Sequence, residues 1–311
     1  MKWGAALMVL LLAPACADST LVQAPARTAE HPVGRATTLG PGNDEELPPY
    51  SNKRAMRHVR VLARKIGPRV RARPAEWRAS KYIRRRFETY GYQTKIQRFS
   101  VDGGTSRNVI AWWPGAHKNG LVVGGHMDTV RRSPGANDNA SGIAVVLEMA
   151  RISADRRPAR LVRFVAFGSE EYGTNGEHHN GSQVYVNRLG KRRRQRLGGM
   201  VSIDMVGNGR PLIAARTGRA PQVVARTVHD KMQRKVAMSY QVTCDCSDNG
   251  PFEREGIPSV FLWSGSEPNH HEPTDTVANL RRRDLRRTGI GFRFFLEKLD
   301  GGMIRRFRRA G

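Results

Sequence analysis

The sequence predicts an α/β domain, a three-layer sandwich in which helices cover both faces of a mostly parallel central sheet. Strand-like and helix-like segments alternate along most of the chain, and this alternation is typical of sheets whose crossovers are helices. The 311 residues are enough for one large domain or two small ones. We find no internal repeat, and no apolar run in the body of the chain reaches the about 18 residues that a membrane span needs.

Six segments carry apolar residues at helical spacing, three to four residues apart. The second of them ends near Gly91, a residue type that commonly stops helices. The predicted helices span 53–66, 75–92, 141–152, 182–195, 220–233 and 284–299.

Six short apolar runs, bounded by Gly, Pro or polar residues, predict strands. They span 107–114, 121–128, 161–168, 199–207, 211–216 and 257–263. In an open α/β sheet the ligand site lies at the carboxyl ends of the strands. The residues that follow these runs are therefore the candidates for function.

The amino-terminal segment predicts export. Met1 and Lys2 precede the apolar stretch ALMVLLLAPA, which is typical of a signal peptide and too short for an ordinary membrane span. Small residues before Cys16 resemble a bacterial lipoprotein cleavage box, which would leave Cys16 lipidated; cleavage at an A-x-A site is the alternative. We expect a signal peptide at 1–17, a flexible linker at 18–50 and a folded domain at 51–311. The mature protein would be periplasmic, lipid-anchored in the bacterial envelope, or secreted.

The formal charge of +26 comes mostly from clusters of arginine. A surface this basic attracts polyanions such as nucleic acid, anionic lipid or an acidic envelope polymer. The clusters are scattered along the chain, and aromatic residues are not interleaved with them as in a single-strand-binding groove. We therefore expect no specific nucleic-acid partner and membrane contact only through a lipid anchor, and we keep an anionic envelope surface as a candidate partner.

After the signal segment only Cys244 and Cys246 remain. The pair is too close for a relaxed bridge and lacks the second pair of a zinc knuckle. In an exported protein it could still oxidise to a disulfide.

Histidines and acids lie at the carboxyl ends of several predicted strands or just beyond them, and one acid precedes a helix. They are His126 and Asp128 after LVVGG, Asp138 in PGANDNASG, Glu170 and Glu171 after LVRFVAF, Asp204 after MVSI, and His271 in HHEPTDT. Imidazole and carboxylate donors without thiolate suit two divalent ions. One such residue alone is usually structural, but their joint placement at successive strand ends predicts a metal centre.

The ordered motifs GGHMDTV, GANDNASG, FGSEEYG, SIDMVG and HEPTDT resemble those of the di-zinc aminopeptidases of peptidase family M28, over about residues 52–300. The resemblance implies a zinc-peptidase, phosphorylase/hydrolase-like fold over 51–311. It also implies an exported aminopeptidase that acts on peptides with a free N-terminus. His126, Asp138 and Asp204 would hold one Zn²⁺, and Asp138, Glu171 and His271 the other.

The remaining candidates receive roles from the same resemblance and from the chemistry of hydrolysis. A hydroxide shared by the two ions would attack the scissile carbonyl, with Glu170 as general base beside the ligand Glu171. Asp128 would reach the far nitrogen of His126 and fix its tautomer. His270 stands where the family often has Tyr; either its N–H donates to the oxyanion or the ring points away.

Two stretches depart from the family pattern, and other functions stay open because a similar set of carboxylates and histidines serves other enzymes of this fold. Residues 247–249 are SDN where Ser-Asp-His is usual, and an extra EHHN at 177–180 has histidines that we expect to be loop residues near the rim. The alternatives are a glutaminyl cyclase-like single-zinc enzyme, a carboxypeptidase of the wider clan, or a catalytically dead basic envelope-binding protein. Metal content distinguishes the main cases: two zincs favour the peptidase, one the cyclase and none the binding protein.

Overall fold

The computed structural model describes residues 46–265 and 267–311. The predicted signal peptide and the linker up to residue 45 lie outside the described residues and stay predictions. Residues 47–50, which we assigned to the linker, pack on the domain. Leu47 is buried, and Nε of Arg293 donates to the carbonyl oxygens of Leu47 and Pro48, both at 3.0 Å.

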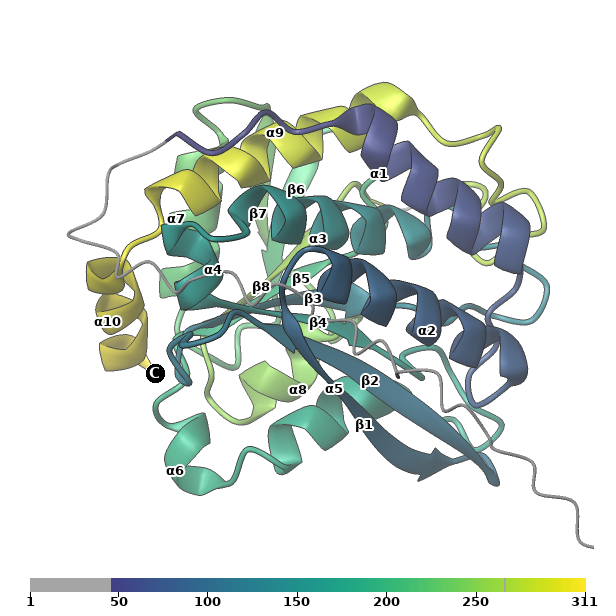
Figure 1. Ribbon diagram of the computed structural model, residues 1–311, viewed down its shortest axis with the longest axis horizontal. Coiled ribbons are helices and arrows are strands. Elements are labelled where there is room, and N and C mark those ends of the chain that lie inside the picture. The colour runs from purple at the N-terminus through teal and green to yellow at the C-terminus, as the bar shows by residue number, and fades with distance from the viewer. Residues whose placement is uncertain (1–45, 266) are drawn as a thin grey trace, which may run out of the picture. The chain divides into compact units, whose positions relative to one another are not determined.

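One eight-stranded sheet lies at the centre of the domain (Figure 1), in the order β1-β2-β4-β3-β5-β8-β6-β7. The strands are β1 (Gln93–Val101), β2 (Gly104–Trp112), β3 (Leu121–His126), β4 (Val162–Phe167), β5 (Gly199–Ile203), β6 (Leu212–Arg216), β7 (Met238–Val242) and β8 (Ser259–Trp263). The central run β4-β3-β5-β8 is parallel, as is β6-β7, whereas β1-β2, β2-β4 and β6-β8 are antiparallel. The predicted α/β class is confirmed, with a sheet of mixed direction.

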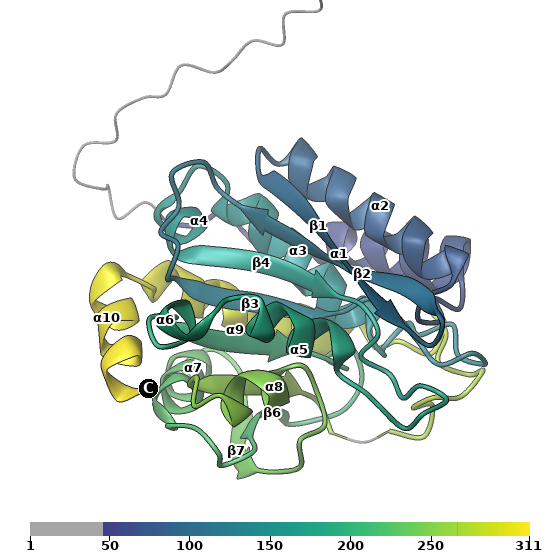
Figure 2. The ribbon, with the colours of Figure 1, turned by 90° about the horizontal axis from the view of Figure 1, so that it is seen from below.

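Helices cover both faces of the sheet (Figures 1 and 2). On one face α2, α3 and α7 contact the strands, and α1 and α9 pack on those helices; α5 and α8 contact the other face. The helices are α1 (Asn52–Val59), the π-helix η1 (Arg60–Ile66), α2 (Pro74–Thr89), α3 (Ala140–Ser153), α4 (Arg157–Leu161), α5 (Asn180–Asn187), α6 (Lys191–Arg194), α7 (Val223–Met232), α8 (Asn249–Arg254), α9 (Arg282–Lys298) and α10 (Gly301–Ala310).

The central strands are continuous apolar runs because both of their faces are buried. In β3, Val123 joins the apolar cluster that contains α3, while Val122 joins the cluster on the α5 and α8 side. Successive side chains of a strand point to opposite faces. A strand between two helical layers must therefore be apolar at every position.

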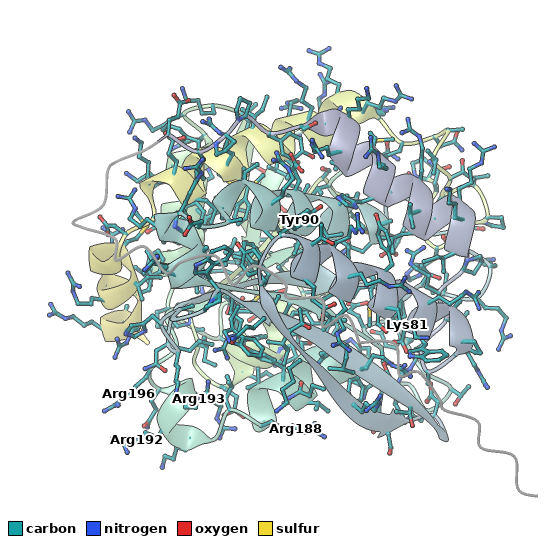
Figure 3. The ribbon with its side chains drawn as sticks, in the orientation of Figure 1. Lys81, Tyr90, Arg188, Arg192, Arg193 and Arg196 are labelled. Carbon is teal, nitrogen blue, oxygen red and sulfur yellow. A yellow bond between two sulfur atoms is a disulfide. The ribbon has the colours of Figure 1, made fainter. Side chains whose placement is uncertain are left out.

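Many basic side chains lie on the outside of the domain, whereas those of Arg69 and Arg71 are buried. Arg188, Arg192, Arg193 and Arg196 are exposed and extend outward where α5 and α6 meet (Figure 3). Within the described ranges, none of the helices combines the length and the apolar character that crossing a membrane requires.

Candidate active site

The carboxyl ends of four parallel strands bring the candidate residues to one edge of the sheet. His126, the last residue of β3, is in register with Phe167, the last residue of β4. At the end of β5, Ile203 is in register with Leu262 of β8. The two glutamates and Asp204 follow these ends directly, so the sheet itself brings together segments far apart in the sequence.

The first turn of α3 is fixed against the end of β5. Asn139 caps the helix by accepting the N–H of Gly142 at 2.8 Å, and its amide donates to the carbonyl of Ile203 at 3.0 Å. A Cβ on Gly142 would overlap that same carbonyl oxygen, so only glycine permits this approach. Asp138 precedes the cap, and its backbone N–H donates to the carboxylate of Asp275 at 3.0 Å.

The carboxylate of Asp138 lies between two histidines. Its Oδ1 is 3.1 Å from Nε2 of His126, and its Oδ2 is 3.2 Å from Nε2 of His271. Oδ1 of Asp204 is 3.3 Å from Nε2 of His126, and Oε2 of Glu171 is 3.0 Å from Nε2 of His271. Two sets of donors therefore share one aspartate.

These donors fit zinc in spacing and in type. Tetrahedral zinc with bonds of about 2.0–2.1 Å places neighbouring donor atoms about 3.4 Å apart, close to the separations of 3.0–3.3 Å between these atoms. Oδ1 of Asp204 and Oε1 of Glu171 are buried and have no hydrogen-bond donor among the described residues. Because buried carboxylates are costly without a cation, the arrangement suits two divalent ions.

Glu170 lies beside the candidate metal ligands, and its pKa is shifted from the usual value. Its Oε2 is 3.8 Å from Nε2 of His126. Burial, reinforced by the charges of Glu171 and Asp204, holds the pKa of Glu170 well above its usual value, against the opposing effect of His126. Cations bound next to it would lower that pKa. A carboxyl group in this environment suits proton transfer near neutral pH.

Asp128 contacts the glutamate pair more closely than it contacts His126. Its Oδ1 is 3.6 Å from Nδ1 of His126, which is longer than a hydrogen bond. Its two oxygens instead accept the backbone N–H groups of Glu170 at 3.0 Å and Glu171 at 3.1 Å. Asp128 thus fixes the backbone that carries both glutamates, a contribution that the sequence analysis did not foresee.

His270 turns toward the donors. Its Nε2 is 3.4 Å from Oδ2 of Asp138, and its ring lies 3.9 Å, centroid to centroid, from that of His271. All eight residues named from the sequence therefore form one contiguous cluster.

Three supporting residues were missed in the sequence. Ser247 donates to Oδ2 of Asp204 at 2.9 Å, and Asp275 accepts the N–H groups of residues 137 and 138. Both lie inside motifs that had been noted, SDN and HEPTDT. His179 belongs to EHHN, whose histidines we expected near the rim; it is buried, and its Nε2 lies 2.9 Å from Oε1 of Glu170.

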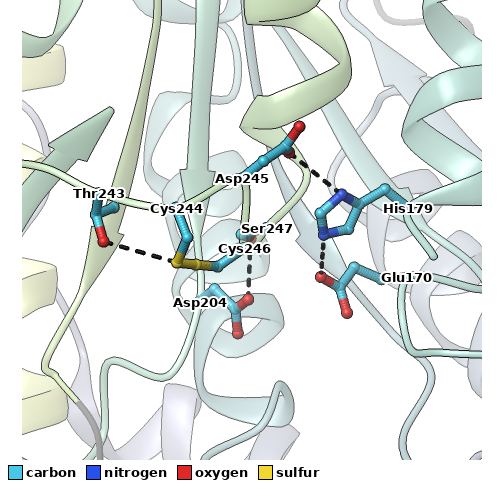
Figure 4. Close-up of a disulfide and its surroundings, with 8 residues drawn as sticks. All are labelled: Glu170, His179, Asp204, Thr243, Cys244, Asp245, Cys246 and Ser247. Atoms are coloured by element: carbon cyan, nitrogen blue, oxygen red, sulfur yellow. Dashed lines mark hydrogen bonds and ion pairs between the residues drawn. A yellow bond between two sulfur atoms is a disulfide. The ribbon is translucent and has the colours of Figure 1, made fainter. Parts of the chain in front are cut away.

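A disulfide joins Cys244 to Cys246, with their Cα atoms 5.2 Å apart. It closes the turn just before Ser247 and places Asp245 beside His179 (Figure 4).

Comparison with known proteins identifies the family. The model of peptidase family M28 matches residues 108–295, and the chain belongs to this family. Leupeptin-inactivating enzyme 1 of Streptomyces exfoliatus is 31% identical over 211 residues, which cover 67% of this chain and 47% of that protein. The probable lipoprotein aminopeptidase LpqL of Mycobacterium tuberculosis is 30% identical over 225 residues, covering 60% and 44%. The chain thus spans about half, or less, of the length of these relatives.

Solved structures share the fold at low sequence identity. A zinc aminopeptidase from Bacillus subtilis superposes with a TM-score of 0.74 at 19% identity, covering 82% of this chain and 98% of that one. A glutaminyl cyclase from Bacteroides thetaiotaomicron, bound to N-acetylhistamine, has a TM-score of 0.69 at 19% identity, covering 82% and 100%.

Proposed function

We propose that the chain is an exported zinc-dependent aminopeptidase that hydrolyses the N-terminal peptide bond of peptides. The observation that carries this proposal is the placement of Asp138, whose two oxygens face His126 and His271 separately. A single-metal site has no need of a shared carboxylate, whereas two ions about 3.5–4 Å apart do. The naming of LpqL as a probable lipoprotein aminopeptidase supports the same activity.

The proposed ligands divide into two sets around Asp138. His126, Asp138 and Asp204 hold one Zn²⁺, and Asp138, Glu171 and His271 hold the second. When bound, the zinc ions polarise the scissile carbonyl and lower the pKa of water to about 7.

Glu170 moves the proton in the proposed reaction. It takes a proton from the attacking water as the new C–O bond forms, and it passes that proton to the amine as the C–N bond breaks. Asp128 keeps Glu170 in place through the backbone N–H. His270, half-exposed beside Asp138, donates to the oxygen that becomes negative when water adds.

The proposed setting is the bacterial envelope or the outside of the cell. Residues 1–17 carry the signal pattern, with Cys16 as the site of lipid attachment in the lipoprotein case. A relative named as a probable lipoprotein aminopeptidase supports an anchored location. An anionic envelope surface is the proposed additional partner, because of the charge of +26.

A substrate panel distinguishes this proposal from the cyclase alternative. The test is needed because the fold is similar to that of a glutaminyl cyclase. The zinc-loaded protein is assayed on aminoacyl-anilides and on peptides with N-terminal Gln. We expect release of free amino acid. Formation of pyroglutamate without hydrolysis would establish the cyclase, and no turnover of either substrate would contradict both enzymes.

Glu170→Gln tests the proposed base. The amide keeps the shape of the side chain but cannot accept the proton, so we expect hydrolysis to fall by about 10²–10⁴-fold with zinc content unchanged. Elemental analysis is the control for the metal. Near-normal turnover would remove Glu170 from this role.

A further inference from the structure

We propose that His179 is a positioning residue for Glu170. Its ring N–H donates a hydrogen bond to one carboxylate oxygen of Glu170. The other oxygen of Glu170 then faces the metal-binding side chains. This inference rests on the proposed role of Glu170 as base.

His179 is attached to Glu170 twice. Nε2 of its ring lies 2.9 Å from Oε1 of Glu170, and its backbone N–H donates to the carbonyl oxygen of Glu170 at 2.8 Å. The ring is about 2% exposed, so water does not compete for the contact. The second oxygen of Glu170, Oε2, is the one near His126, at 3.8 Å. The two carboxylate oxygens therefore have different surroundings (Figure 4).

The start of α5 fixes where His179 sits. The residue precedes the helix with a left-handed backbone, φ 55°. Its carbonyl oxygen accepts the N–H of Gln183 at 2.9 Å and the hydroxyl of Ser182 at 3.1 Å. The ring thus projects from a backbone that is held on both sides, by the helix and by Glu170.

In the proposed hydrogen bond the ring is neutral and its proton lies on Nε2. Burial, together with nearby His178 and Arg254, lowers the pKa of His179 to about 2. A neutral imidazole has one donor and one acceptor nitrogen. Nε2 faces a carboxylate oxygen at hydrogen-bond distance, whereas Nδ1 has no hydrogen-bond partner among the described residues.

Asp245 is compatible with this tautomer. Its Oδ1 lies 3.5 Å from Nδ1 of His179, too far for a strong hydrogen bond. The carboxylate pairs with Arg254 and lies 3.6 Å from Nη1 of Arg219, so most of its charge is compensated. Asp245 lies between the two cysteines of the Cys244–Cys246 disulfide.

The contact matters because a glutamate side chain has several rotatable bonds. Without His179, the carboxylate of Glu170 could rotate away from the attacking water or turn to bind metal. Hydrogen-bond partners that orient groups at metal sites typically contribute 10–100-fold to activity. The effect should appear in kcat, because Glu170 acts on the reaction and not on substrate binding.

Three variants with wild-type zinc content test the proposal kinetically. His179→Leu should lower kcat by about 10–100-fold with little change in KM. His179→Gln should recover most of that loss, because its amide N–H reaches the position of Nε2. His178→Leu is the matched control: this half-buried neighbour stacks on Tyr172 and packs edge-on against the ring of His179, but neither contact involves Glu170, so its loss should change kcat far less than His179→Leu does. Wild-type kcat in His179→Leu, or no advantage of Gln over Leu, would overturn the proposal.

A second measurement does not depend on activity. In zinc-loaded wild-type protein labelled with ¹⁵N-histidine, where the bound cations keep Glu170 as a carboxylate, the ring signals absent from His179→Gln should report the Nε2–H tautomer. An Nδ1–H tautomer or a charged ring would contradict the hydrogen bond to Glu170. If the wild-type protein hydrolyses no substrate, the proposed function fails, whereas a wrong tautomer in an active enzyme defeats only the inference about His179.

Discussion

His270 is the residue whose chemistry departs most visibly from the family pattern. Its half-exposed ring faces Asp138 from the open side of the site. We expect His270→Ala to lower kcat by about 10²–10³-fold, as loss of one oxyanion donor does, with little change in KM. Steady-state kinetics on an aminoacyl-anilide measure both constants. A wild-type kcat would mean that the oxyanion is stabilised without His270.

At the level of residues, the sequence was enough to find the candidate metal ligands but not the residues that hydrogen-bond to the site and hold it in place. His126, Glu171 and Asp204 could be found because the ends of parallel strands meet at one edge. Asp275 and His179 could not, because their partners are set by how loops fold over that edge. Adjacent histidines in EHHN look equivalent in sequence, yet one is buried at Glu170 and the other stacks on an exposed tyrosine.

Helix α1 contains a buried titratable group that is not among the residues of the candidate site. Nδ1 of His58 is 2.6 Å from the hydroxyl of Tyr82, and burial, aided by the charges of Arg86 and Arg57, lowers the pKa of His58 from 6.5 to about 4. The unfolded chain therefore takes up this proton first as the pH falls. The stability that the folded state gains from neutral His58 is therefore full above pH 6.5 and is lost as the pH falls to about 4.

Urea unfolding of the zinc-free protein at pH 7.5 and 4.5 checks this expectation. The free energy of unfolding of the wild type should fall by about 2–3 kcal/mol more than that of His58→Gln, which cannot take up the proton. Exposed His117→Gln serves as the control and should behave as the wild type. Equal pH dependence in wild type and His58→Gln would show that His58 does not carry this effect.

Among the elements, the buried ones were predictable and the peripheral ones were not. All six predicted strands exist, because strands with two covered faces are apolar runs. The edge strands β1 and β7 were missed, since β1 mixes buried with exposed residues and the residues of β7 are exposed or half-exposed, which gives a weak pattern. The predicted helix 182–195 breaks into α5 and α6 at Gly190, where φ is 70°. Helix α8 is too short, at 6 residues, for periodicity to detect.

For the molecule as a whole, the charge of +26 includes one local concentration away from the catalytic edge. A hollow of about 750 Å³ between β1, β2, β4 and the α5–α6 turn has no acidic residue in its lining. The cations around it are Lys95, Lys118, Arg163, Arg188 and Arg193. Phosphate groups of an anionic surface would complement this hollow.

Vesicle sedimentation tests this expectation for the full chain. Binding to vesicles with anionic phospholipid should exceed binding to neutral vesicles and weaken as added salt shortens the Debye length below about 10 Å. Replacing Lys118, Arg188 and Arg193 by Gln should weaken binding more than the same change at exposed residues 281–283, which removes equal charge. Equal losses would show that binding depends on the total positive charge of the protein and not on this hollow.

The number of zinc ions per chain tests the central claim most directly. Elemental analysis of purified protein, dialysed after zinc loading, should give two zincs for the wild type. Asp138→Ala should bind fewer than any variant of a ligand that serves one ion, because this carboxylate faces both histidines. One zinc in the wild type, or two retained in Asp138→Ala, would contradict a site built around a shared aspartate.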